Sequence, residues 1–482
     1  MRGLASDEAA LTPYVRIDRD GVCIISPRAE MGQGVHTTLA ALVAEELDVS
    51  LAEIRVEHGP AASTYFNAAL FADEAPFRST DTGFVAESMR QFMHVPAKFL
   101  GLQITGGSSS IPDAYDKMRK AGASARVVLL QAAARKLHRD INTLTTERGF
   151  VVSNDGIRLP YTELASLAAD IEPPTDPQLK PKSHWRILGR SQQRVDMLAK
   201  CTGTGLFSID VNLPGMLFAT VRMNPHLGGT MVRFDATDAQ TMPGVEKIVS
   251  LEGGVAVVAT NTWYAFQAAK AIGIEWSEGP YPPSSEEHFA IVRSAMAGEP
   301  DTQLHDDGNV EDISADASII EGEYRVPYLA HATMEPLNAV ALLKDGRLDV
   351  WAGTQFPTQV VVEGAKIAEV PQDAVHVHTT LLGGGFGRRL EMDFIKTAIS
   401  VAKALPRRPV KVTWSREEDM GHDTFRAACD REIPSRCRRW RTTEPRFKTC
   451  LALGRGFPVG ASRDLRIGTR QNHCAGRLGP AL

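Results

Sequence analysis

Cysteine is scarce in this sequence and unevenly placed. Of six cysteines, only Cys23 and Cys201 lie outside the C-terminal segment; the others are Cys429, Cys437, Cys450 and Cys474. Their spacings match neither a zinc ligand pair nor the closely spaced cysteines that hold an iron–sulfur cluster. The sequence therefore predicts no protein-ligated metal and no iron–sulfur centre within this chain.

Long apolar runs are absent as well. No stretch of about 18 consecutive apolar residues occurs, so a transmembrane helix is not expected. Residues 1–21 contain neither the apolar core of a signal peptide nor a twin-arginine pair. As written, the chain carries no export signal, and we expect it in the cytoplasm.

The common nucleotide-binding loops are also missing. Residues 383–387 are glycine-rich, but no Gly-Lys-Ser/Thr follows them, as a P-loop requires. Arg388 stands where a dinucleotide fingerprint needs its third glycine. The net charge of −5 argues against a general nucleic-acid binder. Neither nucleotide loop is therefore predicted.

Length and composition indicate a multidomain globular protein. At 482 residues, about three domains are expected. Strand-like and helical segments are mixed, which predicts an α+β fold. A proline-rich connector separates a first region, residues 13–172, from a small α+β domain at residues 185–280. An acidic connection, residues 280–314, leads to a third region at residues 319–426.

The most informative segment is residues 375–393, where an alternating strand runs into small residues and then toward a helix. Gly383, Gly384, Gly385 and Gly387 lack Cβ atoms, so the backbone can adopt positive φ and its amides can approach an anionic ligand closely. Phe386 would then lie at the ligand surface. The alternative interpretation is a tight glycine turn that caps a helix.

Two more loops of this kind precede predicted helices. Residues 31–34, Met-Gly-Gln-Gly, come before an apolar stripe that continues to Leu47. Residues 106–110, Gly-Gly-Ser-Ser-Ser, come before a second helical segment. Free amides at a helix N-terminus favour an anion. For the serines alone, helix capping is the preferred interpretation.

Several motifs follow one another in a particular order. They are MGQG at 31–34, GGSSS at 106–110, TGT at 202–204, LPGML at 213–217, MEP at 334–336, TQ at 354–355 and GGGFGRR at 383–389. As a set they resemble the molybdopterin-binding subunits of the xanthine dehydrogenase and aldehyde oxidase family, most closely the isoquinoline 1-oxidoreductase type. The resemblance implies a hammerhead domain at 185–280 and parts of two molybdopterin-binding domains on either side.

The resemblance also implies a molybdenum–molybdopterin cofactor in its cytosine dinucleotide form. The matching positions are Met31, Gly32, Gln33, Gly34, Gly107, Ser108, Ser109, Ser110, Gln355, Gly385, Phe386 and Gly387. Gln355 and the Phe386-Gly387 amide would face the apical oxo ligand of molybdenum. No side chain of the chain is implied as a metal ligand. His36, His331, His376 and His378 are expected to be packed or exposed histidines without a chemical role.

The implied reaction is hydroxylation beside a ring nitrogen or at an aldehyde carbon. Electrons would leave through a small partner subunit that carries [2Fe–2S] clusters. The family places a glutamate base in its C-terminal part, and nothing here matches it; neither Glu432 nor Glu444 is assigned that role. Arg389 and Leu390 replace the lysine and glutamate of xanthine dehydrogenase, so purine substrates are not expected.

From residue 427 the sequence becomes rich in arginine and loses regular periodicity. We interpret residues 427–482 as an aberrant, disordered tail after a frame shift, which would leave a truncated chain with impaired cofactor binding and catalysis. One alternative is a non-catalytic scaffold remnant of the family. Another is a basic nucleic-acid tail, which this segment resembles poorly because lysines and interleaved aromatics are few. Members of this family are often exported to the periplasm.

Overall fold

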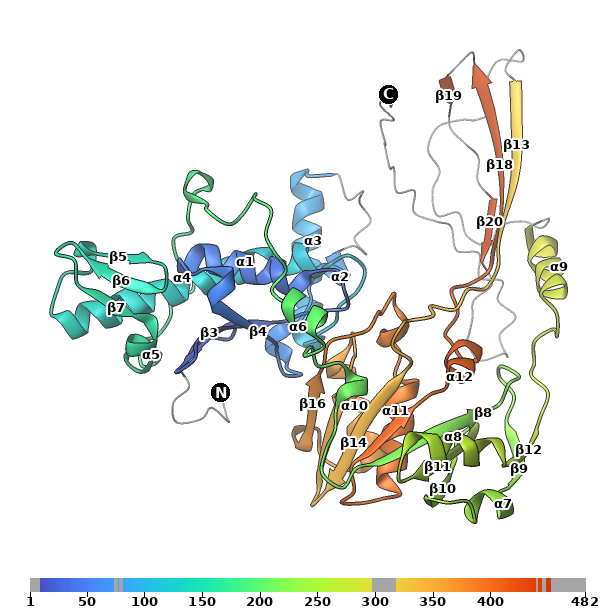
Figure 1. The fold of residues 1–482 in the computed structure, drawn as a ribbon. Coiled ribbons are helices and arrows are strands. Elements are labelled where there is room, and N and C mark those ends of the chain that lie inside the picture. Colours follow the sequence, from blue (N-terminus) through green and yellow to red (C-terminus); the bar gives the residue numbers. More distant parts are fainter. Residues whose placement is uncertain are drawn as a thin grey trace.

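The computed structural model describes residues 9–72, 77, 81–296, 318–438, 441–443 and 448–451. Helices and strands are mixed in sequence and in space (Figure 1), which confirms the predicted α+β class. Within the described ranges, no helix combines the length and the apolar character needed to cross a membrane.

The N-terminal unit is a four-stranded sheet covered by helices. Its strands, in order, are β1 (Ala9–Thr12), β2 (Val15–Asp18), β3 (Gly21–Ser26) and β4 (Ile54–His58). The first three are antiparallel, and β4 runs parallel to β3. Helices α1 (Val35–Leu47) and α4 (Ser110–Leu137) pack together, and the core between helices and sheet contains Ile17, Ile24, Leu39 and Leu129. Both loops predicted to precede helices therefore do so.

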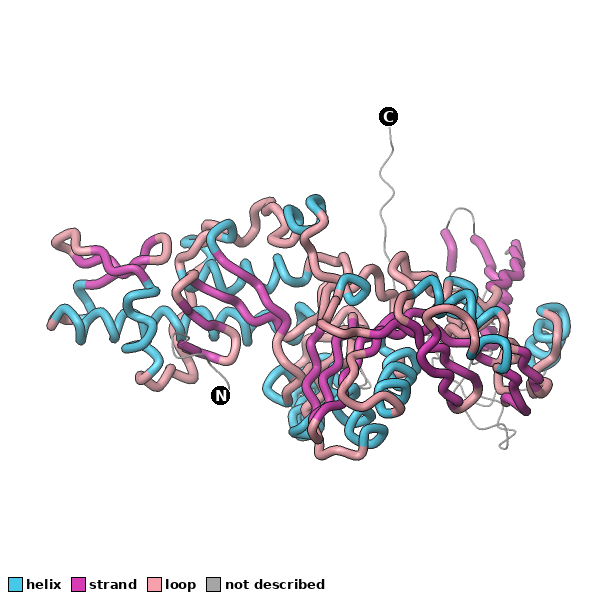
Figure 2. The backbone as a smooth tube through the Cα atoms, turned by 60° about the horizontal axis from the view of Figure 1, so that its bottom comes forward, coloured by secondary structure: helices cyan, strands magenta, loops and turns pink. Residues whose placement is uncertain are grey.

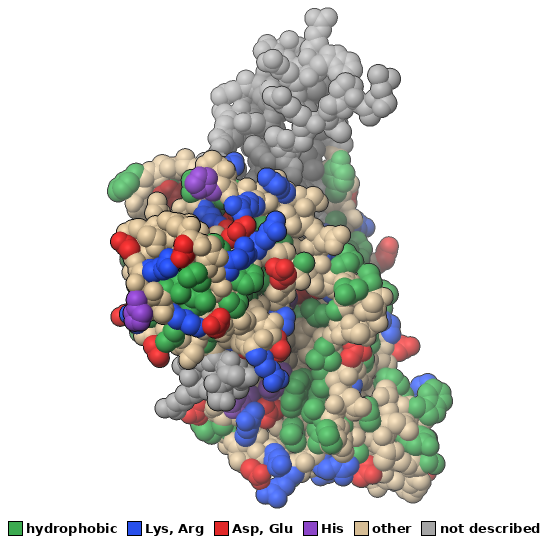
Figure 3. Space-filling view, turned by 60° about the vertical axis from the view of Figure 1, so that its left-hand side comes forward, with side chains coloured by type: hydrophobic (Ala, Val, Ile, Leu, Met, Phe, Trp, Pro, Cys, Tyr) green, Lys and Arg blue, Asp and Glu red, His purple; other side chains and the backbone are tan. Residues whose placement is uncertain are grey.

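Smaller elements extend this unit. The sheet β5 (Leu144–Glu147), β6 (Phe150–Ser153) and β7 (Arg158–Pro160) lies beside helix α5 (Tyr161–Ala169). Helices α2 (Ala69–Ala72) and α3 (Phe84–Leu100) connect α1 to α4 along the chain, and α3 exposes Phe84, Phe92 and Phe99. Figure 3 shows charges of both signs interspersed on one face of the molecule, together with apolar side chains.

A seven-stranded sheet forms the centre of the second unit. Its order is β10 (Val245–Leu251), β11 (Gly254–Ala259), β8 (Leu217–Met223), β17 (Val410–Thr413), β14 (Asn338–Lys344), β15 (Arg347–Ala352) and β16 (Val375–Thr379). Strand β8 pairs in parallel with β17. Residues 185–280 and 319–426 were expected to be separate domains, but strands from both ranges share this one sheet. The expected domain boundaries stay predictions.

Several helices belong to the same part of the chain as this sheet. They are α6 (Met197–Thr202), α7 (Thr237–Gln240), α8 (Thr262–Lys270), α10 (Pro357–Ala368), α11 (Asp393–Lys403) and α12 (Arg416–Gly421). A two-stranded sheet joins β9 (Met231–Asp235) to β12 (Gly273–Trp276). Phe394 and Ile399 of α11 are buried in one core with Val350 of β15. Figure 2 shows the N-terminal unit and this sheet as neighbours joined by loops.

Two segments differ from their predicted structure. Part of the expected acidic connection at 280–314 forms helix α9 (Ser285–Met296), while residues 297–314 lie outside the described residues. The expected disordered tail also contains strand β18 (Cys429–Arg438), which pairs along its length with β13 (Ser318–Val326). Short strands β19 (Arg441–Thr443) and β20 (Lys448–Leu451) also pair with β18. Backbone pairing with β13 orders a segment whose side-chain pattern had predicted no structure.

The crossing of α1 and α4 supplies a test of this packing. A Cβ atom at Gly122 of α4 would lie 2.7 Å from the carbonyl oxygen of Val43 in α1. We therefore expect Gly122→Val to lower the free energy of unfolding by about 1–3 kcal/mol through overpacking. Urea unfolding followed by circular dichroism measures the change. Gly273→Val is the matched control, because nothing lies within 4 Å of a Cβ atom there; equal effects at both positions would contradict the close crossing.

Candidate functional site

Three of the predicted loops meet at Gly385. A Cβ atom built there would lie 2.6 Å from the sulfur of Met31 and 2.8 Å from Oε1 of Gln355. These residues come from three separate segments of the sequence, and only a glycine at 385 leaves room between them. The structure therefore brings together the segments at 31–34, 355 and 383–387 around one small cradle.

Gln355 connects a fourth predicted segment, the loop at residues 106–110, to the cradle. Its side chain is 2% exposed, and Nε2 donates a hydrogen bond of 2.8 Å to the carbonyl oxygen of Thr105. The amide of Thr105 in turn donates to the carbonyl oxygen of Gln355 at 2.8 Å. These two bonds fasten the loop of residues 106–110 beside the glycine loop, where Gly106 lies against Leu390.

The other side-chain atom of Gln355 is unsatisfied. Oε1 is buried and has no hydrogen-bond partner among the described residues. If the Gln355 side-chain amide were flipped, its oxygen would face the carbonyl oxygen of Thr105, and two acceptors would be in contact. The assignment of Nε2 and Oε1 therefore follows from the hydrogen bonds. A buried acceptor without a donor costs about 1–3 kcal/mol. This cost is removed if a ligand in the cradle donates a hydrogen bond to Oε1.

The glycine loop has the backbone shape predicted for a close ligand approach. Gly384 and Gly387 have φ values of 101° and 106°, and Phe386 is also left-handed at 55°. Phe386 is 71% exposed, so it is not a core residue. The helix-cap alternative holds in part, because Gly387 is the N-cap of a short 3-10 turn at Arg388–Leu390, whereas α11 begins only at Asp393.

Arg389 holds the glycine loop from inside. Its guanidinium is fully buried, with Nε donating to the carbonyl oxygen of Gly384 at 2.8 Å and Nη2 donating to Oε2 of Glu335 at 2.9 Å. The same carboxylate oxygen accepts the amide of Gly383 at 2.9 Å. Burial lowers the pKa of Arg389, and the charge of Glu335 opposes that shift. The family resemblance matched Arg389 to a lysine of xanthine dehydrogenase; in this fold Arg389 braces the glycine loop and is buried.

The loop at 31–34 differs from its expected role. Glu30 occupies the N-terminus of α1, with Oε1 accepting the amides of Gly32 and Gly34 at 2.9 and 3.1 Å. The Gln33 side chain folds back, donating to the carbonyl oxygen of Ala29 at 3.0 Å and accepting the amide of Met31 at 2.8 Å. The free amides predicted at this helix end are therefore already satisfied by the chain's own carboxylate. Met31 is the residue of this loop that reaches the cradle.

A charged pair behind this loop holds Glu30 in place. Arg194 donates from Nη2 to Glu30 at 3.0 Å and from Nε to Asp196 at 2.9 Å. Burial alone would raise the pKa of Asp196, but hydrogen bonds from Arg194 and Lys200 outweigh it and lower the pKa below its usual range.

The loop at 106–110 leaves its helix end open. Ser109 occupies the N-cap of α4 but makes no capping hydrogen bond. Its hydroxyl donates to the carbonyl oxygen of Gly106 at 2.6 Å and accepts from Asn67 at 2.8 Å. Capping, the preferred interpretation of the serines, is therefore wrong for Ser109. Gly107 and Ser108 are exposed at this end, and Ser110 begins the helix. An unsatisfied helix N-terminus attracts anions.

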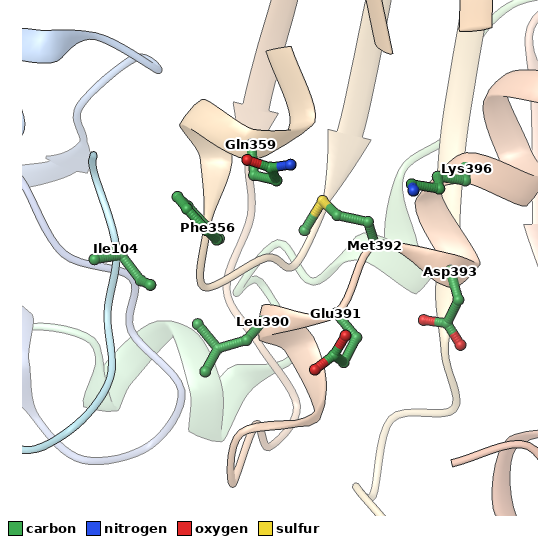
Figure 4. A pocket seen from close by; sticks show the side chains of 8 residues that line it. All are labelled: Ile104, Phe356, Gln359, Leu390, Glu391, Met392, Asp393 and Lys396. Carbon is green, nitrogen blue, oxygen red and sulfur yellow. The ribbon is translucent and has the colours of Figure 1, made fainter. Parts of the chain in front are cut away.

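A cavity of about 620 Å³ lies beside Leu390, in the turn that follows the glycine loop (Figure 4). It is lined by Ile104, Phe356, Gln359, Leu390, Glu391, Met392, Asp393 and Lys396. Burial raises the pKa of the Glu391 carboxyl, and the charge of Asp393 raises it further. The cavity is thus mainly apolar near Leu390 and carries ionisable groups toward α11.

The four histidines have different surroundings. His36 is buried with Nε2 3.0 Å from the carbonyl oxygen of Arg28, and His376 is exposed. His378 stacks on Trp351, with ring centroids 4.6 Å apart. His331 and His378 are each paired with an aspartate, Asp423 and Asp349, and His331 also lies beside Gly387. No group of three or more His, Cys, Asp or Glu side chains in the described ranges could hold a metal ion.

Sequence reasoning missed the residues that support the site. Thr105, Glu335 and Asp423 carry its decisive hydrogen bonds, yet none stands in a recognisable ligand spacing. Glu335 was noticed only as part of the motif at 334–336. The importance of Glu335 follows from its buried position, and the sequence does not show which residues are buried.

This chain is similar in sequence to known proteins. The family models described as "Molybdopterin cofactor-binding domain" match residues 296–433 and 4–72. The beta subunit of isoquinoline 1-oxidoreductase from Brevundimonas diminuta is 30% identical over 470 residues, covering 87% of this chain and 56% of that protein. Membrane-bound aldehyde dehydrogenase (pyrroloquinoline-quinone) of Gluconacetobacter polyoxogenes is 29% identical, covering 83% and 49%. A nicotinate dehydrogenase subunit from Pseudomonas putida is 28% identical, covering 86% and 32%. The chain thus spans about half the length of these relatives, or less.

The buried pair of Arg389 and Glu335 is open to a direct test. We expect Arg389→Met to destabilise the protein by about 3–5 kcal/mol, because it leaves Glu335 as a buried, unpaired charge. Arg347→Met is the control, since its pair with Asp349 is more exposed and should cost below about 1 kcal/mol. Urea midpoints measure both variants. A similar small loss in each would show that Arg389 does not brace the loop.

Acid titration tests the anchor of the loop at 31–34. The folded pKa of Asp196 lies below its unfolded value of about 3.9. Its stabilising effect is therefore complete above that value and is lost as the pH falls toward the folded pKa. We expect thermal midpoints of Asp196→Asn to fall less steeply than wild type below about pH 4. Asp176→Asn, in an exposed pair with Lys120, should keep the wild-type slope; identical slopes in all three proteins would refute the assignment.

Proposed function

The chain belongs to the molybdopterin-binding subunits of the xanthine dehydrogenase and aldehyde oxidase family, and from this premise we propose that the loops around Gly385 bind its molybdenum–molybdopterin cofactor. The observation that carries the proposal is the unsatisfied Oε1 of Gln355, which lies so close to Gly385 that no Cβ atom would fit there. A pterin ring system carries N–H donors and is flat, so it suits a narrow cradle with one buried acceptor. The residues present therefore fit the group.

Each loop has a physical task in this proposal. The backbone of residues 385–387 lies close to the ligand because no Cβ blocks Gly385 or Gly387. Met31 and the exposed ring of Phe386 supply apolar contacts on either side of the cradle. Gly107, Ser108 and Ser110 surround the open end of α4, which suits a phosphate because the helix N-terminus is positively polarised. A ligand with both a pterin and phosphates, such as the cytosine dinucleotide form, would span these two regions.

Some of the twelve predicted positions act indirectly. Gly32, Gly34 and Gln33 shape the loop that carries Met31, since their polar groups bond to Glu30 and to the loop itself. Ser109 shapes the loop at 106–110 through Gly106 and Asn67. We assign direct contacts to Met31, Gly107, Ser108, Ser110, Gln355, Gly385, Phe386 and Gly387.

When bound, the molybdenum centre supplies a two-electron hydroxylation chemistry. We propose an N-heteroaromatic compound or an aldehyde as the substrate, because three relatives that match most of this chain are named for isoquinoline, aldehyde and nicotinate oxidation. The cavity is apolar where Phe356, Leu390 and Met392 line it, which suits a flat, weakly polar substrate. Electrons would pass to a small partner subunit with [2Fe–2S] clusters.

The cofactor assignment is tested by substitution at the cradle. We expect Gly385→Ala to abolish cofactor retention, because the new methyl group would overlap Met31 and Gln355. Molybdenum per chain, measured by mass spectrometry on the purified protein, should fall at least tenfold. Gly421→Ala is the control, since nothing lies within 4 Å of a Cβ atom there. Cytidine monophosphate released by acid hydrolysis identifies the dinucleotide form.

Three outcomes separate the candidates. Molybdenum with substrate-dependent dye reduction supports the oxidoreductase. Molybdenum without turnover, in the presence of the partner subunit, supports the non-catalytic cofactor-binding alternative. Wild-type protein expressed in a host that makes the cofactor, yet free of molybdenum, would overturn the proposal.

A further inference from the structure

His331 and Asp423 are joined at the base of a long antiparallel ribbon. Leu329 and Arg426 exchange backbone hydrogen bonds of 3.3 and 3.0 Å, and β13 with β18 continues the same pairing away from the site (Figure 1). This pairing brings residue 331 next to residue 423, although 92 positions separate them. The ribbon therefore carries one histidine and one carboxylate to the edge of the glycine loop.

The carboxylate of Asp423 fixes how the imidazole is protonated. It accepts the backbone amide of His331 and lies 2.9 Å from Nδ1 of the same residue. Asp423 is 1% exposed, and Nε of Arg388 lies 3.0 Å from its Oδ1. Burial alone would raise the pKa of Asp423, but the hydrogen bonds from His331 and the charge of Arg388 lower it. An ionised Asp423 makes Nδ1 the protonated nitrogen, so Nε2 carries a lone pair.

That lone pair faces the glycine loop. A Cβ atom at Gly387 would lie 3.4 Å from Nε2 of His331. Among the hydrogen bonds found for the described residues, none involves Nε2, and the side chain is only 17% exposed. Ala332 and Phe386, which adjoin the two contacting residues, both have left-handed backbones, with φ of 47° and 55°. Strain of this kind persists where the surrounding structure requires one particular geometry.

We propose that His331 is a proton acceptor for an O–H acid bound at the glycine loop, with Asp423 as its positioning residue. This inference rests on the proposed function only in taking residues 385–387 as the ligand face. The O–H bond of the ligand breaks, an N–H bond forms at Nε2, and the ionised Asp423 stabilises the resulting imidazolium. Buried His–Asp pairs act in this way when the aspartate holds the ring and balances its charge.

Other charged groups around the ring are accounted for. Arg388 is shared between Asp423 and Asp393, to which it donates at 2.8 and 2.7 Å. Asp419 pairs with Arg416 at 2.9 Å. Glu391 lines the neighbouring cavity, and its raised pKa reflects burial first and the charge of Asp393 second. None of these groups has a hydrogen bond to His331 among the described residues, so Asp423 is the partner that determines its tautomer.

The chain offers a matched control pair. His378 lies 2.9 Å from Asp349 through Nε2, and its ring stacks on Trp351 at an exposed sheet edge. Its side chain is 43% exposed. This pair has the same chemistry, but its carboxylate binds the opposite nitrogen and no glycine loop adjoins the ring.

Nitrogen NMR of histidine-labelled protein tests the proposal without any need for turnover. The spectra are recorded on the full chain with and without the molybdenum cofactor, and His331→Gln and His378→Gln assign the signals. We expect the Nδ1–H tautomer at His331, a tautomer change in Asp423→Asn, and a shift of the His331 Nε2 signal on cofactor loading. The His378 signals should stay unchanged. Two results would overturn the role of His331 and leave the cofactor proposal standing. One is the Nε2–H tautomer in the wild type; the other is an unchanged His331 signal in protein shown to contain molybdenum.

Kinetics supply a second readout in the assembled holoenzyme. We expect His331→Gln to lower kcat about 10²–10⁴-fold, the usual contribution of a positioned base, with KM nearly unchanged and molybdenum content retained. Asp423→Asn should also lower kcat, and His378→Gln should not. Full activity of His331→Gln would refute the role of His331. Protein without molybdenum in every sample would instead overturn the cofactor proposal, which distinguishes the two failures.

Discussion

The site depends on one buried guanidinium. Arg389 donates to carbonyl oxygens of Gly384, Gly353 and Glu335 and pairs with the Glu335 carboxylate. Its own carbonyl oxygen accepts the amide of Gln355 at 2.8 Å. A glycine-rich loop has little intrinsic preference for one shape, because each glycine loses more backbone entropy on ordering than other residues do. The directional bonds of a planar, permanently charged group compensate for this freedom.

The N-termini of α1 and α4 both follow glycine-containing loops, but they differ in how far the chain itself neutralises their positive end. At α1 the carboxylate of Glu30 satisfies the amides of the loop, so the positive end of the helix is neutralised from within. At α4 the N-cap side chain of Ser109 bonds elsewhere. The attraction for an external anion is therefore concentrated at residues 107–110, while the loop at 31–34 contributes shape and an apolar contact. A cofactor with one flat end and one phosphate end matches this division.

Long-range pairing decides which groups stand around the cradle. The parallel contact of β8 with β17 joins two parts of the chain into one sheet, and the ribbon of β13 and β18 sets His331 against Asp423. Both depend on backbone hydrogen bonds between segments far apart in sequence. Strand β18 shows the limit of pattern-based reasoning, because its irregular composition predicted disorder while its backbone found a complete partner in β13.

The sequence by itself determined the α+β class, the helices after two of the loops, the positive φ values in the glycine loop and the set of segments that form the site. These features follow from residue type and local spacing, since a missing Cβ or an apolar period acts within a few residues. Tertiary structure alone decided that Arg389 turns inward, that Glu30 occupies the α1 terminus, and that Oε1 of Gln355 is left without a donor. Each of these depends on packing between residues brought together only by the fold, and no local pattern encodes which buried polar atom will remain unpaired.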